Sequence, residues 1–459
     1  MTILLPIFNG LRARNFFLTD LYPELLKGGA HLVILVPSHK VEYYRKTYAH
    51  SQVVFESWDP QREHWFGRAL QWLAFNALGT GTVRRKQYAF FVRDRNILKF
   101  AIRRLVGVLF GGSRLFRKFL RILDRAIPAD YSVAALIAKH KPSLVLAPDI
   151  ILVSDRLALR AAKRAIVPTV GMVRSWDNLT AKGVIQVMPD WLVAQTDVMK
   201  EEVVRLGDME RGRIRVCGVS QFDEYWKPAT KTREEFLRSL SIPTERRVVL
   251  CAPFFGEYSQ SSGIMLVQKL ARAIDDGRLP KDIHLLVRYR PEDLTAPKAP
   301  DTAHFNHPRI TVTKPYSVPF KTSRGKSDFE FTRADVDLMV NSLRWSDVVI
   351  TTISTLTVDA IALNKPVINI RFDVDPHTPA QDRVELFSHF DHYLALEKTG
   401  GVRLAHSFEE LLERLHVYLN SPSLDNGGRA RVRREQIQYE DALSGARSAQ
   451  AILRVASGS

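Results

Sequence analysis

A hydroxyl-bearing pair, Ser354 and Thr355, lies between the apolar run DVVIT and a segment with helical spacing. The pattern predicts a strand, a turn and then a helix from Thr355 to Leu363. The free N–H groups at such a helix start, together with the helix dipole, favour an anion such as phosphate. Asp359 follows one turn later and is able to accept hydrogen bonds from sugar or ribose hydroxyls. The alternative is that Ser354 or Thr355 only caps the helix.

Two Asp-x-Asp triplets, Asp335–Asp337 and Asp373–Asp375, have the spacing to hold a divalent cation against a diphosphate. The first falls in a predicted amphipathic helix and is expected to face solvent. We predict no metal site, and the second triplet is the alternative. The phosphate-loop, G-x-G-x-x-G, H-E-x-x-H and G-x-S-x-G patterns do not occur, so kinase, dehydrogenase, zinc-hydrolase and esterase functions lose their main support.

The elements that position these residues alternate short apolar runs with helical patterns, as in an α/β protein with parallel sheets. In the first half a helix is expected over Leu157–Ala165, and in the second half over Ser262–Asp275. The strands predicted in the first half are MTILLPIF, HLVILVP, SQVVFES, SLVLAPDI, PTVGMV, WLVAQT and RIRVCGV. Those predicted in the second half are VVLCAPFF, HLLVRYR, RITVTKP, DVVITT and PVINIRF.

The chain of 459 residues is too long for a single core, and two domains are expected. A polar stretch with two prolines separates the two strand-rich halves. The prediction is therefore a first domain over 1–226, a linker over 227–246, a second domain over 247–425 and a helical tail over 426–459. No run is long and apolar enough for a membrane span, and the start reads as a buried strand rather than a signal peptide. Cys217 and Cys251 are expected to be buried core residues in a reducing cytoplasm.

The net charge of +17 is concentrated in one segment. Residues 61–125 hold 15 Lys and Arg against 3 Asp and Glu, a net charge of +12. Leu98, Ile102, Leu105 and Leu109 recur at helical spacing, as do Phe116, Leu120 and Leu123. We expect a basic amphipathic helix pair. It would contact an anionic membrane surface or the protein's own core, and nucleic acid is the third and least favoured partner. Arg103, Arg104, Arg117 and Lys118 are the expected membrane contacts.

Three stretches together resemble GT-B transferases, especially the families around CDP-glycerol glycerophosphotransferases and bacterial surface-glycan transferases. They are the segment 346–373 that includes Ser354 and Asp359, the W-D-N turn and V-x-G-x-x-x-F-D run within 174–226, and HLLVRYRPEDL. UDP-N-acetylglucosamine 2-epimerases share a related version of the first. Where many members have a histidine before the proline, this chain has Arg290. The implied fold is two Rossmann-like domains with parallel sheets facing a central cleft.

The resemblance implies an electrostatic mechanism without cofactor or metal. Arg288 and Arg290, with the Ser354 and Thr355 helix start, would stabilise the charge on a leaving nucleotide diphosphate. If the enzyme inverts, an acceptor hydroxyl must lose a proton to a base. Asp177 and Asp149 are the candidate bases; alternatively, Asp149 caps a helix and Asp177 forms a turn with Asn178. Gly10 and its loop, with Arg12 and Arg14, are a weaker candidate for approaching a phosphate.

The leading hypothesis is a glycosyltransferase of polysaccharide biosynthesis that moves a sugar from a nucleotide-sugar donor to a surface glycan, expected to be lipid-linked. We expect it in the cytoplasm, docked peripherally at the inner face of the cell membrane, with no nucleic-acid partner. The first alternative keeps the fold and changes the reaction to a CDP-glycerol-type polyol-phosphate transferase or a UDP-sugar 2-epimerase. The second is a non-catalytic membrane scaffold with a degenerate GT-B fold.

Overall fold

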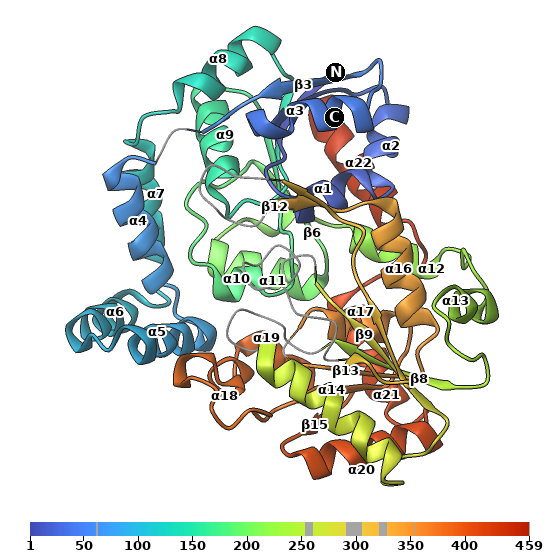
Figure 1. Ribbon diagram of the computed structural model, residues 1–459. Helices are drawn as coiled ribbons and strands as arrows, with labels where there is room; N and C mark the ends of the chain where they lie inside the picture. The colour runs from blue at the N-terminus through green and yellow to red at the C-terminus, as the bar shows by residue number, and fades with distance from the viewer. Residues whose placement is uncertain (61–62, 253–259, 291–304, 321–327, 353, 459) are drawn as a thin grey trace. The chain divides into compact units, whose positions relative to one another are not determined.

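A computed structural model describes residues 1–459 except 61–62, 253–259, 291–304, 321–327, 353 and 459 (Figure 1). The end of the predicted strand VVLCAPFF, the proline after Arg290 and the start of the basic segment lie outside the described residues. The chain forms two compact units. Unit 1 comprises Met1–Asp223 and Asp441–Ser459, and unit 2 comprises Glu224–Glu440.

Unit 1 contains a seven-stranded sheet in the order β3-β2-β1-β4-β5-β6-β7, and every strand pair in it is parallel. The strand order reverses between β1 and β4. At such a switch point the loops after the two strands diverge and leave room for a ligand at their carboxyl ends. The strands are β1 (Thr2–Pro6), β2 (His31–Val36), β3 (Val53–Ser57), β4 (Leu144–Ala147), β5 (Thr169–Met172), β6 (Trp191–Ala194) and β7 (Ile214–Val216).

Side chains along the central strands of unit 1 point alternately to the two faces of the sheet, and each face has its own hydrophobic core. Ile3 and Leu5 of β1 join one buried cluster, whereas Leu4 between them joins another. A strand that is apolar at every position suits a sheet with helices on both faces. The helices of unit 1 are α1 (Gly10–Phe17), α2 (Leu21–Lys27), α3 (Val41–Thr47), α4 (Trp65–Asn76), α5 (Gly81–Asp94), α6 (Ile97–Phe110), α7 (Arg114–Arg125), α8 (Tyr131–His140), α9 (Val153–Arg164), α10 (Asn178–Ala181), α11 (Asp197–Gly207) and α22 (Ser444–Ala456).

Unit 2 contains a six-stranded parallel sheet in the order β10-β9-β8-β13-β14-β15, with its switch point between β8 and β13. The α/β class with two parallel sheets, predicted from the apolar runs, is confirmed. The short strand β15 and the antiparallel pair β11–β12 were not predicted. The strands are β8 (Arg247–Ala252), β9 (Ile283–Arg288), β10 (Ile310–Thr313), β11 (Val318–Phe320), β12 (Asp328–Glu330), β13 (Val348–Thr351), β14 (Val367–Ile370) and β15 (Arg403–Ala405).

The helices of unit 2 include α13 (Arg233–Ser239), which lies inside the stretch 227–246 that was expected to be a linker. The capping box of Thr232 and Glu235 explains why this polar stretch folds as a helix. The others are α14 (Gln260–Asp275), α16 (Arg333–Arg344), α17 (Leu356–Ala362), α18 (Val384–Ser388), α19 (Asp391–Lys398), α20 (Phe408–Asn420) and α21 (Asn426–Gln436). Both Cys217 of unit 1 and Cys251 of unit 2 are buried, as predicted.

The segment expected to form a tail after residue 426 is divided between the units, because α21 belongs to unit 2 and α22 to unit 1. The carboxylate of Asp223, in the short helix α12 (Asp223–Trp226), accepts hydrogen bonds from the backbone N–H groups of Ser444 at 3.1 Å and Gly445 at 2.7 Å. A Cβ atom on Gly445 would lie 2.9 Å from the backbone nitrogen of Leu21. Glycine therefore lets α22 begin directly against the first part of the chain.

In the described part of the basic segment, residues 63–125, four helices form, α4 to α7, where a pair was expected (Figure 1). Helix α6 has no buried residue, so Leu98 and Leu105 of its apolar stripe are exposed. Helix α7 packs through Leu120, which is buried. Arg117 was expected at a membrane, and this prediction is wrong: its side chain is buried and donates to Asp208 at 2.9 and 2.5 Å. Across the described residues, no helix has both the length and the apolar character needed to cross a bilayer.

Candidate functional site

The turn after β13 carries the hydroxyl pair at the switch point of unit 2. The hydroxyl of Ser354 accepts a hydrogen bond from the N–H of Leu356 at 3.2 Å. Thr355 occupies the capping position of α17, but its side chain makes no capping hydrogen bond and the residue is exposed. The capping role considered from the sequence therefore applies to Ser354 and not to Thr355. Buried Thr357 in turn donates to Asn369 of β14 at 3.0 Å, which fixes α17 on the sheet.

Asp359 is half-buried on α17 and accepts a hydrogen bond of 2.6 Å from the phenol of Tyr225. Tyr225 is buried, and its backbone carbonyl accepts from Arg344 at 2.9 Å. Tyr225 was not predicted as a site residue, because the run around it has the pattern of a chain that enters a linker. The sequence itself holds no signal for this contact, because Tyr225 and Asp359 are 134 positions apart. The hydrogen bond from Tyr225 thus fixes the orientation of the Asp359 carboxylate.

Arg288 ends β9 and is buried, while Arg290 is half-buried two residues later. Tyr289 between them is buried against Phe305. Strand β9 and strand β13 both flank β8, so the two arginines and the Ser354 turn belong to the same carboxyl edge of one sheet. Guanidinium groups at such an edge match the geometry of phosphate oxygens. The predicted donor residues therefore share one edge of unit 2.

In unit 1, Gly10 begins α1 directly after β1, and Asn9 caps the helix by accepting from the N–H of Arg12 at 3.1 Å. Arg12 is buried and its Nη1 lies 3.2 Å from a carboxylate oxygen of Asp155. The same Nη1 donates to the hydroxyl of Ser154 at 3.2 Å. Arg12, predicted weakly as a phosphate contact, thus ties α1 to α9. Its buried Nε has no hydrogen-bond partner within the described part of the chain.

Asp149 follows β4 at the same edge, fully buried, and its Oδ2 accepts from Nε of Arg174 at 3.0 Å. Its backbone N–H donates to Asp155 at 2.8 Å. Burial raises the pKa of Asp155 to about 6, while the charge of Arg12 lowers it and that of Asp149 raises it. Two carboxylates and two arginines therefore form one network, in which Arg174 is half-buried and the other three side chains are buried. Asp155 and Arg174 were not identified from the sequence, because each looked like an ordinary helix or loop residue.

Asp177 follows β5, lies immediately before α10 and is half-buried. Its charge acts on Lys86 of α5, whose Nζ donates to the carbonyl of Ala181 at 3.0 Å. Burial lowers the pKa of Lys86 to about 8; the charge of Lys182 lowers it further, and Asp177 opposes the shift. Lys86 was counted only as part of the basic segment. The structure places it next to the W-D-N turn, so this segment also serves the edge that carries Asp177.

The Asp-x-Asp triplets have structural partners. The expectation that Asp335 faces solvent is wrong: it is buried, forms a capping box with Thr332 and accepts from the N–H of Tyr316. Asp373 accepts from the N–H of Val384 at 3.0 Å, and burial raises the pKa of Asp373. Among the described residues no group of three or more His, Cys, Asp or Glu side chains is placed to hold a metal ion.

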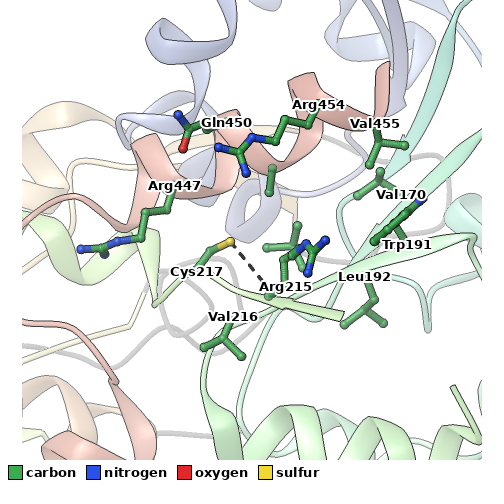
Figure 2. Close-up of a pocket in the computed structure, with 12 residues that line it drawn as sticks. Val170, Trp191, Leu192, Arg215, Val216, Cys217, Arg447, Gln450, Arg454 and Val455 are labelled. Carbon is green, nitrogen blue, oxygen red and sulfur yellow. Dashed lines mark hydrogen bonds between the residues drawn. The ribbon is translucent and has the colours of Figure 1, made fainter. Parts of the chain in front are cut away.

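A cavity of about 210 Å³ lies between α22 and strands β5 to β7 of unit 1 (Figure 2). Its apolar wall includes Leu192 and Val455, and Arg215 and Arg454 extend into the space between β7 and α22. Both Arg213 and Arg215 lie over the ring of Trp191, at 4.8 and 5.2 Å. None of the site residues predicted from the sequence lines this cavity.

Solved structures with the same fold cover nearly the whole chain. A UDP-N-acetylglucosamine 2-epimerase from Neisseria meningitidis, bound to UDP-N-acetylglucosamine, is 11% identical with a TM-score of 0.56, over 99% of this chain and 100% of the epimerase. The epimerase from Methanocaldococcus jannaschii is 11% identical with a TM-score of 0.51, over 94% and 99%. A glycosyltransferase from Rickettsia africae is 12% identical with a TM-score of 0.50, over 99% and 98%. At these identities the likeness concerns the fold.

No curated protein matches the sequence. The model of the family described as CDP-glycerol:poly(glycerophosphate) glycerophosphotransferase matches residues 184–454, which make up more than half of the chain. The match includes Arg288, Ser354 and Asp359 and reaches into α22. The chain therefore belongs to the CDP-glycerol:poly(glycerophosphate) glycerophosphotransferase family, and it is a transferase with the GT-B fold.

Proposed function

We propose that this protein takes a group from a nucleotide-activated donor, held by unit 2, and adds it to a surface glycan carried by a membrane lipid. The observation that carries the proposal is the shared edge of unit 2, where Arg288, Arg290 and the Ser354 turn follow neighbouring strands. Charge that develops on a leaving diphosphate would be stabilised there by fixed guanidinium and N–H donors. We propose that this occurs without a metal ion.

Two donors fit this chemistry. The first is a nucleotide sugar. With either donor, Arg290 can bind a phosphate but cannot accept the proton of the acceptor hydroxyl, so the base must be another residue. The fold relative from Neisseria meningitidis, solved with UDP-N-acetylglucosamine, is consistent with a nucleotide-sugar donor. The second is CDP-glycerol, which the family description favours. A UDP-sugar 2-epimerase shares only the fold.

For the base we favour Asp177 over Asp149. Asp149 is fully buried and already bound by Arg174, so its role is to hold that arginine. Asp177 is half-buried in the W-D-N turn, with the charge of Lys86 close enough to interact with it. A base must reach the acceptor hydroxyl, and accessibility therefore favours Asp177.

The membrane acceptor is supported by the exposed face of α6 and α7. Six large apolar residues of α6 and three of α7 are exposed, a pattern of interfacial helices that insert their apolar face below the lipid headgroups. Basic side chains, including exposed Lys99 and Lys118, flank this face. The exposed apolar residues are Ile97, Leu98, Ile102, Leu105, Val108 and Leu109 of α6 and Leu115, Phe119 and Ile122 of α7. We propose peripheral docking on an anionic bilayer at the cytoplasmic side.

A thermal-shift panel of UDP-, GDP- and CMP-linked sugars and CDP-glycerol, each with and without EDTA, tests the proposal. A donor present at 100 times its Kd stabilises the folded protein by about 2.7 kcal/mol. Stabilisation by a nucleotide sugar, unchanged by EDTA and followed by transfer to a lipid-linked acceptor, is expected. Stabilisation by CDP-glycerol alone supports the second candidate. No response to any donor would leave the scaffold alternative, and loss of the response in EDTA would contradict the metal-free scheme.

A further inference from the structure

We propose that unit 1 carries a second ligand site, a pocket that binds a phosphate or phosphodiester group away from the transfer site. The cavity has a volume of about 590 Å³, within the range of roughly 300–1,000 Å³ that small-molecule sites occupy. Its floor is the apolar segment Val187–Pro189. Five cationic side chains line it, from α7 and α9: Arg121, Arg125, Arg160, Lys163 and Arg164.

The pocket lies at the opposite edge of the sheet from the candidate bases. Lys163 and Arg164 end α9 and come before β5, and Val187–Pro189 come before β6. They therefore belong to the amino ends of these strands. Asp149 follows β4 at the carboxyl end. Catalytic groups in open parallel sheets gather at the carboxyl ends, so a ligand here is bound and not transformed.

Part of the positive charge has acidic partners and part does not. Arg160 donates to both carboxylate oxygens of Asp124, at 3.1 and 2.8 Å. Nη1 of Arg121 lies 3.0 Å from Oδ2 of Asp208, and Lys163 forms an ion pair with Asp190. Arg164 instead donates to the backbone carbonyl of Arg125 at 3.1 Å, and a carbonyl does not neutralise a guanidinium charge. Across the described residues, neither Arg125 nor Arg164 forms an ion pair. The pocket therefore keeps an excess of positive charge.

One buried N–H donor of the pocket has no acceptor within the described part of the chain. Arg160 is only 4% exposed, and its Nη1 has no hydrogen-bond partner within the described part of the chain. Buried N–H groups nearly always have partners, and leaving one unsatisfied costs about 1–3 kcal/mol. A ligand oxygen would satisfy it.

Phosphate is the anion that this arrangement favours. It offers several acceptor oxygens around one centre, and guanidinium groups contact such oxygens in pairs. Two sources have this chemistry: a soluble phosphodiester and the headgroup of an anionic lipid. The second is available because α7 also exposes Leu115, Phe119 and Ile122 on another part of its surface. The phosphate site itself does not depend on membrane docking or on the identity of the donor.

The test uses the full chain with Arg125→Glu, because Arg125 is exposed and its replacement leaves the packing unchanged. Lys46→Glu, an equally exposed cation on α3, is the matched control for net charge. Pyrophosphate binding is measured by calorimetry on the protein alone and again in the presence of saturating UDP and of saturating CDP, which compete with pyrophosphate at the proposed donor site. We expect Arg125→Glu to weaken this binding by about tenfold or more and Lys46→Glu to leave it within about twofold, against 1.4 kcal/mol for each factor of ten.

Arg160→Lys keeps a cation for Asp124 and removes Nη1. We expect this variant, like Arg125→Glu, to bind pyrophosphate more weakly than wild type. If Arg160→Lys does not fold, the result for Arg125→Glu alone decides. Glycerophosphoglycerol and phosphatidylglycerol vesicles then distinguish the sources. If Arg125→Glu loses binding to the soluble diester, the ligand is a segment of a phosphodiester polymer. If it loses binding only to the vesicles, the ligand is a lipid headgroup. Affinities of Arg125→Glu equal to those of Lys46→Glu for all three probes would overturn the site, whatever donor the enzyme uses.

Discussion

The phenol of Tyr225 donates a hydrogen bond of 2.6 Å to Oδ1 of Asp359, and this bond joins α12 to α17. The tyrosine is buried and the aspartate is half-buried, so one carboxylate oxygen is held from inside the protein. The two residues are 134 positions apart in the sequence. In the proposed donor site, this contact would position the Asp359 carboxylate to accept a hydrogen bond from a donor hydroxyl.

Asp359→Asn should weaken donor binding by about tenfold, since a hydrogen bond to a charged group contributes about 1.5–3 kcal/mol. The asparagine oxygen still accepts from Tyr225, so the free energy of unfolding should change little. Tyr225→Phe is the matched control: it should lower stability by about 1–2 kcal/mol and affect the donor less. Calorimetric titration and urea unfolding measure the two quantities. Donor affinity unchanged in Asp359→Asn would remove this residue from the site.

Single alanine substitutions separate binding from capping in the hydroxyl pair. Ser354→Ala removes the acceptor for the N–H of Leu356 and should lower the free energy of unfolding by about 1 kcal/mol. Thr355→Ala removes no capping bond from an exposed residue, so stability should stay within about 0.5 kcal/mol. Weaker nucleotide binding in Thr355→Ala, with unaltered melting, is expected if the hydroxyl contacts the donor. Equal affinity for wild type and Thr355→Ala would rule out that contact.

The two sheets could be predicted because every strand of their centres is an uninterrupted apolar run, and such runs have few alternatives in a protein of this size. The edge of unit 2 could also be predicted in part, since Arg288 and Ser354 stand directly after such runs. Strand β15 was missed because its RLA is short and begins with a charge. Periodicity carries little signal over three residues.

The partners of the site residues could not be predicted, because contacts distant in the sequence decide them. Arg117 repeats the pattern of its exposed neighbours, and only the position of Asp208 shows that it is buried. Asp335 has the pattern of a solvent-facing helix residue, but the capping box with Thr332 turns it inward. Asp155 looked like any residue of an amphipathic helix, and its burial follows from the packing of α9 against the loop after β1.

Asp155 should make stability depend on pH. Burial raises the pKa of Asp155 to about 6, above about 3.9 for an unfolded aspartate. The folded protein therefore binds more protons between these values, and the contribution of Asp155 to stability falls as the pH rises from about 4 to about 6. The unfolding free energy of wild type relative to Asp155→Asn should decrease by about 2 kcal/mol over that range in urea titrations. A difference that is constant with pH, or that increases, would contradict the assignment.

Arg117 and Lys118 are neighbours on α7 with opposite expected effects. Burial favours a raised pKa for Asp208, but hydrogen bonds from Arg117 and Arg121 lower the pKa overall. Arg117→Ala leaves this buried carboxylate with fewer donors and should lower the free energy of unfolding by about 3 kcal/mol. Lys118→Ala changes an exposed side chain and should stay within about 0.5 kcal/mol. Similar urea midpoints for the two variants would show that the Asp208 cluster contributes little.

The exposed apolar face of α6 and its basic flanks should act on a membrane in two separable ways. Each Lys or Arg near an anionic surface contributes about 1 kcal/mol, and salt screens this attraction over about 8–10 Å. Lys99→Glu combined with Lys118→Glu should therefore reduce sedimentation with phosphatidylglycerol vesicles at low salt to the level that wild type shows at high salt. Buried apolar area does not depend on salt in this way. Leu98→Asn combined with Leu105→Asn should remove the binding that persists at high salt, and should leave stability unchanged because both leucines are exposed. Phosphatidylcholine vesicles should bind wild type no more strongly than anionic vesicles do at high salt, and activity on a soluble acceptor analogue should be preserved in both variants. If wild type does not sediment with anionic vesicles at low salt, the face of α6 contacts something other than a bilayer, and the lipid-linked acceptor loses its support.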